Sequence, residues 1–212
     1  MLPKKEIRLH QRLQLGLIHL AVAMTLVPIN STLNRVMIKE LAISATLVAV
    51  LASLPYLFSP IQVAIGSFAD RHPLFGKHRT PYIVAGLLLC VLGVIVSPYA
   101  AFAMAENFWG GLALGLVAFI AWGMGYNLSA VSYLSLASEM SGEKGRSRTV
   151  AVMFFMMITS IILTAIAISR MVDPYTPQAV LRAFWAVGLA ALALGLLGVF
   201  RLEPRREADQ AS

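Results

Sequence analysis

Residues Gly66–Ile83 read GSFADRHPLFGKHRTPYI and place a dense group of charged and turn-forming residues between two long, uncharged apolar segments. A short charged turn of this kind is typical of the connector of a membrane helix hairpin, on the side of the membrane where cations stay. The chain contains no H-E-x-x-H, Walker A, C-x-x-C-H or G-x-S-x-G motif. The sequence therefore predicts a membrane protein that is not an enzyme.

The composition is that of a membrane protein, with 58% hydrophobic and only 13% charged residues, against about 25% charged in soluble domains. A spanning helix needs about 20 mostly apolar residues. Five uncharged runs reach this length directly, and a sixth does so if Arg182 or Arg201 snorkels to an interface. The runs are Leu13–Asn34, Leu41–Ala69, Thr80–Ala105, Asn107–Ser138, Thr149–Ser169 and Ala183–Phe200. We therefore predict an all-α, polytopic fold with a six-helix transmembrane domain over 13–202, a cytoplasmic interfacial lead-in over 1–12 and a disordered cytoplasmic tail over 203–212.

The net charge of +7 follows membrane topology rather than nucleic-acid binding. Six spans place both termini on one side, and an excess of Lys and Arg marks the cytoplasmic face. The opposite set of loops holds only Arg35, Lys39, Arg170 and Arg182. The set on the side of the termini holds Lys4, Lys5, Arg8, Arg12, Arg71, Lys77, Arg79, Lys144, Arg146, Arg148, Arg201, Arg205 and Arg206. We expect cytoplasmic termini, contact with anionic lipid headgroups, no nucleic-acid partner and no cleavable signal peptide, because the first apolar run is too long for one and lacks a small-residue cleavage site.

The charged turn itself has two readings. Asp70 ends the second predicted span, where an anion faces the negative end of a helix dipole and needs compensation. Arg71, Lys77 and Arg79 are the nearby cations, and Gly66 allows a neighbouring helix to approach the turn. The turn is either an ionic latch that controls movement between helix bundles or a solvated loop that only sets topology.

These residues also carry a resemblance to a known family. The pattern Gly66-x-x-x-Asp70-Arg71, followed by Gly76-Lys77-x-Arg79, resembles the cytoplasmic loop signature of the major facilitator superfamily, which joins the second and third spans. Four residues separate the arginine from the next glycine, where the superfamily has one. This longer turn and its Arg-Thr-Pro-Tyr-Ile exit resemble the PucC-like, bacteriochlorophyll-delivery branch. Further similar segments are Leu33–Leu41, Ser132–Glu139 and Gly145–Arg148.

The resemblance implies a function and a size. Members of that branch have twelve spans, so this chain corresponds to an N-terminal six-helix half. The implied function is a non-enzymatic accessory or assembly subunit of photosynthetic light-harvesting or reaction-centre complexes, which binds or delivers chlorophyll or bacteriochlorophyll in a bacterial cytoplasmic or intracytoplasmic membrane. The implied partners are photosynthetic membrane subunits, lipid, and a second copy or a C-terminal half. The alternatives are a half-size solute transporter that acts as a dimer and a purely structural subunit.

Three residues are candidates for contact with a pigment. His19 is the one histidine inside a predicted span, and a membrane-embedded imidazole is a natural axial ligand for chlorophyll magnesium. The alternative is a neutral histidine hydrogen-bonded to a neighbouring helix. Asn127 and Tyr133 could meet carbonyl substituents of a pigment. Beyond His19 as a magnesium ligand through chlorophyll, no metal site is predicted.

Two further polar clusters interrupt the apolar spans. Asn30 and Asn34 share a helix face, and Arg35 follows at the non-cytoplasmic end with Glu40 as a candidate partner. This cluster is either a headgroup or substrate contact or an interhelical clasp. The second cluster, Ser132, Ser135 and Glu139, has i, i+3, i+7 spacing and forms a polar stripe that lines either a cavity or a helix contact.

Overall fold

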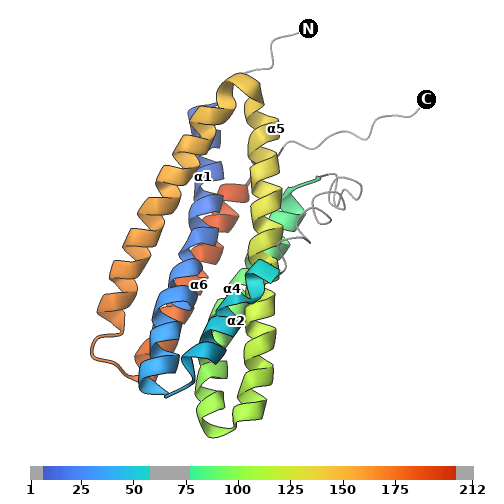
Figure 1. The fold of residues 1–212 in the computed structure, drawn as a ribbon. Coiled ribbons are helices and arrows are strands. Elements are labelled where there is room, and N and C mark those ends of the chain that lie inside the picture. Colours follow the sequence, from blue (N-terminus) through green and yellow to red (C-terminus); the bar gives the residue numbers. More distant parts are fainter. Residues whose placement is uncertain (1–6, 58–76, 204–212) are drawn as a thin grey trace, which may run out of the picture.

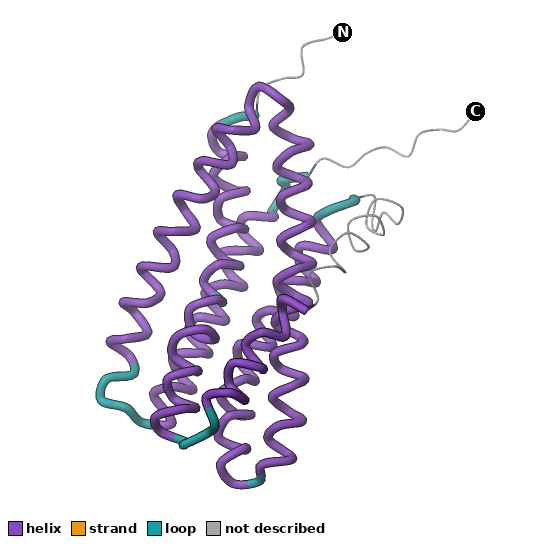
Figure 2. Tube along the Cα trace, in the orientation of Figure 1, coloured by secondary structure: helices purple, strands orange, loops and turns teal. Residues whose placement is uncertain are grey.

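The computed structural model describes residues 7–57 and 77–203, and the elements in these ranges are all helices (Figure 1, Figure 2). They are α1 (Leu9–Met24), the π-helical segments η1 (Pro28–Leu33) and η2 (Val36–Glu40), α2 (Ala45–Leu57), α4 (Thr80–Glu106), α5 (Phe108–Met171) and α6 (Pro177–Val199). The predicted all-α fold is confirmed.

Four helical stretches in the described part are long and apolar enough to cross a membrane, and α2 is a shorter apolar helix. The stretches are Leu9–Glu40, Thr80–Glu106, Phe108–Met171 and Pro177–Val199. The predicted runs Asn107–Ser138 and Thr149–Ser169 lie within α5, apart from Asn107, which is its N-cap, and α5 turns back on itself at Gly142 (Figure 1). Gly142 has φ 60° and ψ −179°, a backbone region that is essentially restricted to glycine. The turn makes the two halves of α5 antiparallel.

The first helix changes its winding at a proline. Pro28 has no N–H to donate to the preceding turn, and the backbone beyond it is wound as a π-helix, in which Leu41 N–H donates to Val36 O at 3.1 Å. π-Helical turns are frequent at functional sites. The wider winding shifts the direction of the side chains that follow, which include Arg35 and Glu40.

Small residues bring α4 and α5 into close contact. Gly86 of α4 lies against Ser129 and Gly125 of α5. A Cβ atom on Gly93 would come within 2.6 Å of Trp122 Cβ. Small residues let membrane helices approach closely, so Gly86 and Gly93 form a face of α4 that contacts α5.

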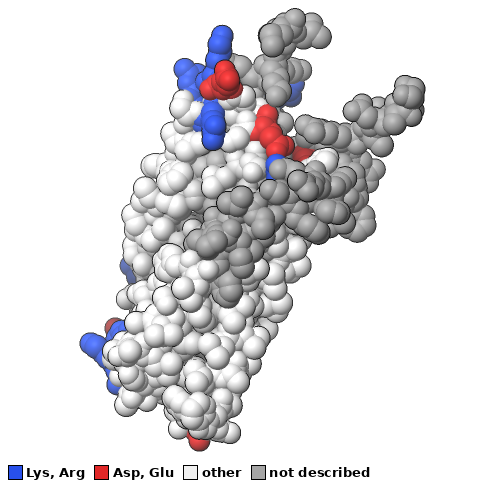
Figure 3. Space-filling view, turned by 45° about the vertical axis from the view of Figure 1, so that its right-hand side comes forward, with Lys and Arg blue, Asp and Glu red and all other residues white. Residues whose placement is uncertain are grey.

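The charged side chains lie mainly at the two ends of the bundle. α1 begins and α6 ends at the same end, where Gln14 Nε2 donates to Phe200 O at 2.9 Å (Figure 1). Figure 3 shows charged side chains gathered at that end and a few at the other, with a broad uncharged band between them. Such a band is the distribution expected of helices that cross a bilayer.

Candidate functional site

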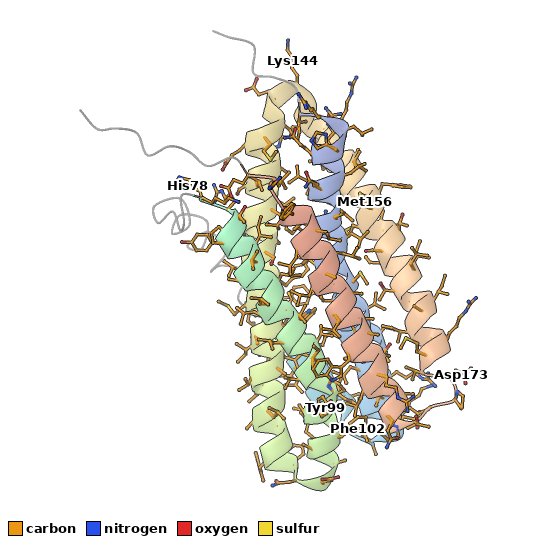
Figure 4. The ribbon with its side chains drawn as sticks, turned by 180° about the vertical axis from the view of Figure 1, so that it is seen from behind. His78, Tyr99, Phe102, Lys144, Met156 and Asp173 are labelled. Carbon is orange, nitrogen blue, oxygen red and sulfur yellow. The ribbon has the colours of Figure 1, made fainter. Side chains whose placement is uncertain are left out.

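The N-terminus of α4 binds a carboxylate from the far end of the chain. The backbone N–H groups of His78, Arg79 and Thr80 donate to Glu203 at 2.9, 3.2 and 2.7 Å. His78 is labelled beside the start of α4 in Figure 4. The first N–H groups of a helix have no partner within the helix and carry the positive end of its dipole, and α4 has no acidic residue in its own first turn. Glu203 therefore joins the end of α6 to the start of α4.

A charged pair lies next to this cap. Arg79 is only 6% exposed, and its Nη2 and Nε atoms donate to Glu139 Oε1 at 2.7 and 3.0 Å. The Glu139 side chain is 43% exposed, so water reaches one partner of the pair. Charge-assisted hydrogen bonds of this kind are stronger than neutral ones. We call Arg79, Glu139 and Glu203 the α4 junction, because they connect α4 with α5 and with the end of α6.

The α4 junction combines residues from two separate sequence patterns. Arg79 belongs to the charged loop and Glu139 to the predicted polar stripe on another helix, and the structure brings the two together. Lys77 of the loop is described and partly exposed. Four other loop residues, Gly66, Asp70, Arg71 and Gly76, lie outside the described residues.

Glu203 was not singled out from the sequence, which assigned it to the tail over 203–212. The structure describes Glu203 and its three hydrogen bonds, whereas residues 204–212 lie outside the described ranges. One signal was present, because Glu203 is the first acidic residue after the last apolar run.

The cap predicts acid sensitivity. Burial alone would raise the pKa of Glu203, but hydrogen bonds from Thr80, His78 and Arg79 outweigh it and hold the pKa below its ordinary value of 4.5. A carboxylate whose pKa is lowered by folding stabilises the fold above its unfolded-state pKa, and this contribution is lost as the pH falls through the lower folded value. We expect the Tm in detergent to decrease as the pH is lowered below 4.5.

The variant Glu203→Gln should have a lower Tm at pH 7 and a flatter decline in acid, because it has no charge to lose. Glu143→Gln removes an exposed carboxylate of α5. In this variant the Tm should decrease with falling pH as steeply as in the original chain. Equal acid slopes for the original chain and Glu203→Gln would contradict the prediction.

A second candidate group surrounds the histidine of α1. The His19 side chain is 5% exposed, and its ring centroid lies 5.0 Å from that of Tyr133 and 5.2 Å from that of Phe154. Its Nδ1 atom is buried and has no hydrogen-bond partner in the described part of the chain. Buried polar atoms are nearly always hydrogen-bonded, so this nitrogen calls for an explanation. We call His19, Tyr133 and Phe154 the histidine cluster.

The open nitrogen of His19 fits axial ligation in its chemistry, but access to the ring is restricted. Phe154 is 46% exposed and lines an open groove of about 710 Å³ on the second half of α5, together with Val150 and Ala151. Phe154 thus belongs both to the histidine cluster and to the groove. Phe154 therefore connects the imidazole of His19 with the groove.

The other candidates on α5 lie among helix contacts. Asn127 is buried and its Nδ2 atom donates to Pro55 O of α2 at 3.2 Å. Tyr133 is 2% exposed. Ser132 is fully buried, and its hydroxyl has no partner among the described residues, while Ser135 is partly exposed. Within the predicted stripe, Glu139 is the member that contacts another helix through an ion pair.

The third candidate group lies at the opposite end of the bundle, where a partly enclosed cavity of about 330 Å³ opens between η1, η2 and the end of α5. We call it the Arg35 cavity. Its polar lining includes Ser31, Arg35, Glu40, Ser169, Asp173 and Tyr175. Figure 4 shows Asp173 at the far end of the molecule from Lys144. Asn30 and Asn34 do not line the cavity, and Asn34 Nδ2 donates to Asn30 O at 3.1 Å.

The expected pairing of Arg35 with Glu40 is not formed. Among the described residues, Arg35 has no ion pair with a carboxylate within 4.0 Å, although both side chains line the same cavity.

Apolar helices of spanning length, with charged groups mainly at the bundle ends, define a polytopic α-helical membrane protein. The chain belongs to the PUCC protein family, whose model matches residues 32–212.

Curated relatives extend the match over nearly the whole chain. The chain is 30% identical to Protein PucC of Cereibacter sphaeroides, over 96% of this chain and 46% of that protein. It is 30% identical to Protein PucC of Rhodobacter capsulatus, over 94% of this chain and 45% of that protein. It is 31% identical to a Rhodobacter capsulatus protein named bacteriochlorophyll synthase 44.5 kDa chain, over 92% of this chain and 45% of that protein. The chain thus spans about half the length of these relatives. No solved structure matches it significantly.

Proposed function

We propose that this chain is a non-enzymatic accessory or assembly subunit of photosynthetic light-harvesting or reaction-centre complexes, and that it binds or delivers chlorophyll or bacteriochlorophyll. The observation that carries the proposal is family membership over residues 32–212, together with a relative whose name refers to bacteriochlorophyll synthase. The proposed location is a bacterial cytoplasmic or intracytoplasmic photosynthetic membrane. The proposed partners are pigment-protein subunits, lipid, and a second copy or a C-terminal half, since the relatives are about twice as long.

The proposed topology has six spans with both termini in the cytoplasm. The two antiparallel halves of α5 support the assignment of the fourth and fifth of these spans. The excess of Lys and Arg on the side of the termini supports the orientation. In this topology the α4 junction is cytoplasmic and the Arg35 cavity lies at the opposite interface.

The proposed pigment contact is the histidine cluster. A chlorophyll-type pigment would supply a magnesium ion that takes an axial nitrogen ligand. His19 would supply that ligand as a neutral imidazole, because a protonated ring has no free lone pair. Tyr133 holds the ring from one side. Phe154, half-exposed on the groove, would have to rotate to admit a pigment and would otherwise exclude lipid from the imidazole.

The test is an absorption spectrum of the chain purified from a pigment-producing host. We expect chlorophyll-type absorption to copurify with the original chain and to fall at least tenfold in His19→Ala. The matched control is His10→Ala, which removes an exposed histidine from the same helix. Far-UV circular dichroism would verify that both variants fold. A colourless original chain that copurifies with no photosynthetic subunit would overturn the proposal, whereas full pigment in folded His19→Ala would reject only the ligand assignment.

A half-size transporter acting as a dimer is the second candidate, and the α4 junction favours it. Rocking of helix bundles would require contacts at one end that can break and reform, and the junction is built from charged groups at one end. Solute uptake into vesicles that contain only this chain, abolished by Asp70→Asn, would support transport. Pigment copurification without uptake would support the assembly function.

A further inference from the structure

The Arg35 cavity has a size and position suited to a small ligand at a membrane surface. Its volume of about 330 Å³ lies at the lower end of the range for ligand pockets. It opens at the end of the bundle where Figure 4 places Asp173. Its walls come from two parts of the chain, the π-helical continuation of the first helix and the last turns of α5 with the loop that follows, which contains Asp173 and Tyr175. A ligand there would contact both.

The charges around the cavity are mixed and are not used within the described structure. Arg35 provides one cation, and Glu40 and Asp173 provide two anions. None of the three takes part in an ion pair within 4.0 Å among the described residues. A ligand that matches this arrangement carries an anion for Arg35 and a cation with N–H donors for the two carboxylates.

The apolar side of the cavity continues along α5 toward the middle of the bundle. Ala165 and Ile168 line the cavity itself. Ile162 and Ile158, about one and two turns from Ala165 toward the middle on the same side of the helix, are 54% and 53% exposed. A ligand whose polar head occupies the cavity could therefore lay an apolar chain along this face. A free amino acid or another small zwitterion would leave the apolar face without a contact.

We propose that the Arg35 cavity binds the headgroup of an ethanolamine phospholipid. Arg35 pairs with the phosphate, Glu40 and Asp173 accept hydrogen bonds from the primary ammonium, and the acyl chains follow the α5 face of Ile158 and Ile162. This inference is independent of the pigment-related function and concerns the other end of the bundle. A phosphatidylglycerol headgroup has no ammonium, and the quaternary ammonium of phosphatidylcholine has no N–H to donate, so the site selects the primary amine.

The test is lipid binding to the full chain, delipidated in detergent and titrated with phosphatidylethanolamine, phosphatidylcholine or phosphatidylglycerol under native mass spectrometry. We expect phosphatidylethanolamine to bind at least tenfold more tightly than the other two lipids, because its primary ammonium donates charge-assisted hydrogen bonds to the two carboxylates. Arg35→Gln and the double variant Glu40→Gln, Asp173→Asn should each abolish this preference. Lys39→Gln is the matched control, since it removes an exposed cation from η2 that does not line the cavity.

Three results would overturn the proposal. Equal binding of the three lipids would show that the site does not recognise the headgroup. An unchanged preference in folded Arg35→Gln and in the double variant would place the lipid elsewhere. Competition by free phosphoethanolamine at the same concentration as the lipid would show that the cavity takes the soluble headgroup and that the α5 face contributes nothing. Thermal unfolding of each variant in detergent would verify that it folds.

Discussion

Gly86→Ala is expected to destabilise the bundle by about 2–3 kcal/mol, the upper part of the range for overpacked cores. The added methyl group would meet the Ser129 backbone nitrogen at 2.6 Å and the Gly125 oxygen at 2.7 Å. These are backbone atoms of the facing helix, which cannot rotate away as a flexible side chain can. The α4–α5 contact would have to open, and the Ser129 Oγ donation to Ile83 O, now 3.2 Å, would lengthen. Unfolding in mixed micelles would measure the loss.

Gly145→Ala adds the same methyl group to another helical glycine of the bundle. The nearest atoms to that methyl would be 3.7–3.9 Å away, at ordinary contact distance. Alanine favours a helix over glycine by about 1 kcal/mol, so this variant should be neutral or slightly stabilised. If Gly86→Ala matched Gly145→Ala in stability, the close approach of α4 and α5 would be refuted.

Glu139→Ala is expected to destabilise the protein by about 2 kcal/mol, because it removes the carboxylate that pairs with the buried Arg79 guanidinium. Removing one partner of a fully buried pair costs about 3–5 kcal/mol. Glu139 is 43% exposed, so solvent screening reduces the effect in this case. Unfolding of the purified variants in mixed micelles would give the value.

Two further variants separate the pair from a general loss of charge. Glu143→Ala removes an exposed carboxylate from the same helix and should change stability by about 0.5 kcal/mol or less. The double variant Arg79→Met, Glu139→Ala should recover part of the loss, because it leaves no buried cation behind. A double variant whose loss equals the sum of the two single losses would show that the two residues do not interact.

Much of the fold could be predicted from the pattern of apolar and charged residues. Uncharged runs of about 20 residues or more predicted apolar helices of spanning length, and the described part of the chain contains such helices. The predicted boundary between Asn107–Ser138 and Thr149–Ser169 is the turn at Gly142, where two antiparallel helical halves of α5 meet. A composition pattern detects the polar residues of such a turn, but it does not show which residue adopts the glycine-specific backbone conformation.

The candidate sites were predicted less completely. His19 lies within the apolar stretch Leu9–Glu40, but its contact with Phe154 depends on how α1 packs on α5, because the two residues are 135 apart in sequence. The cap of α4 by Glu203 connects residues 123 apart. Such contacts leave no local periodicity that a sequence pattern could show.

The sequence by itself determined the membrane class, the helical fold, the family resemblance and the distribution of charge, because these depend on local composition and on short motifs such as the Gly66–Ile83 turn. Only the tertiary structure decided which polar groups meet. It paired Arg79 with Glu139 and placed Glu203 on the start of α4. It also placed Arg35 in a cavity with Glu40 and Asp173, without an ion pair among the described residues. The reason is physical: hydropathy decides which segments favour the membrane, whereas the pairing of buried charges depends on the directions and distances that helix packing imposes.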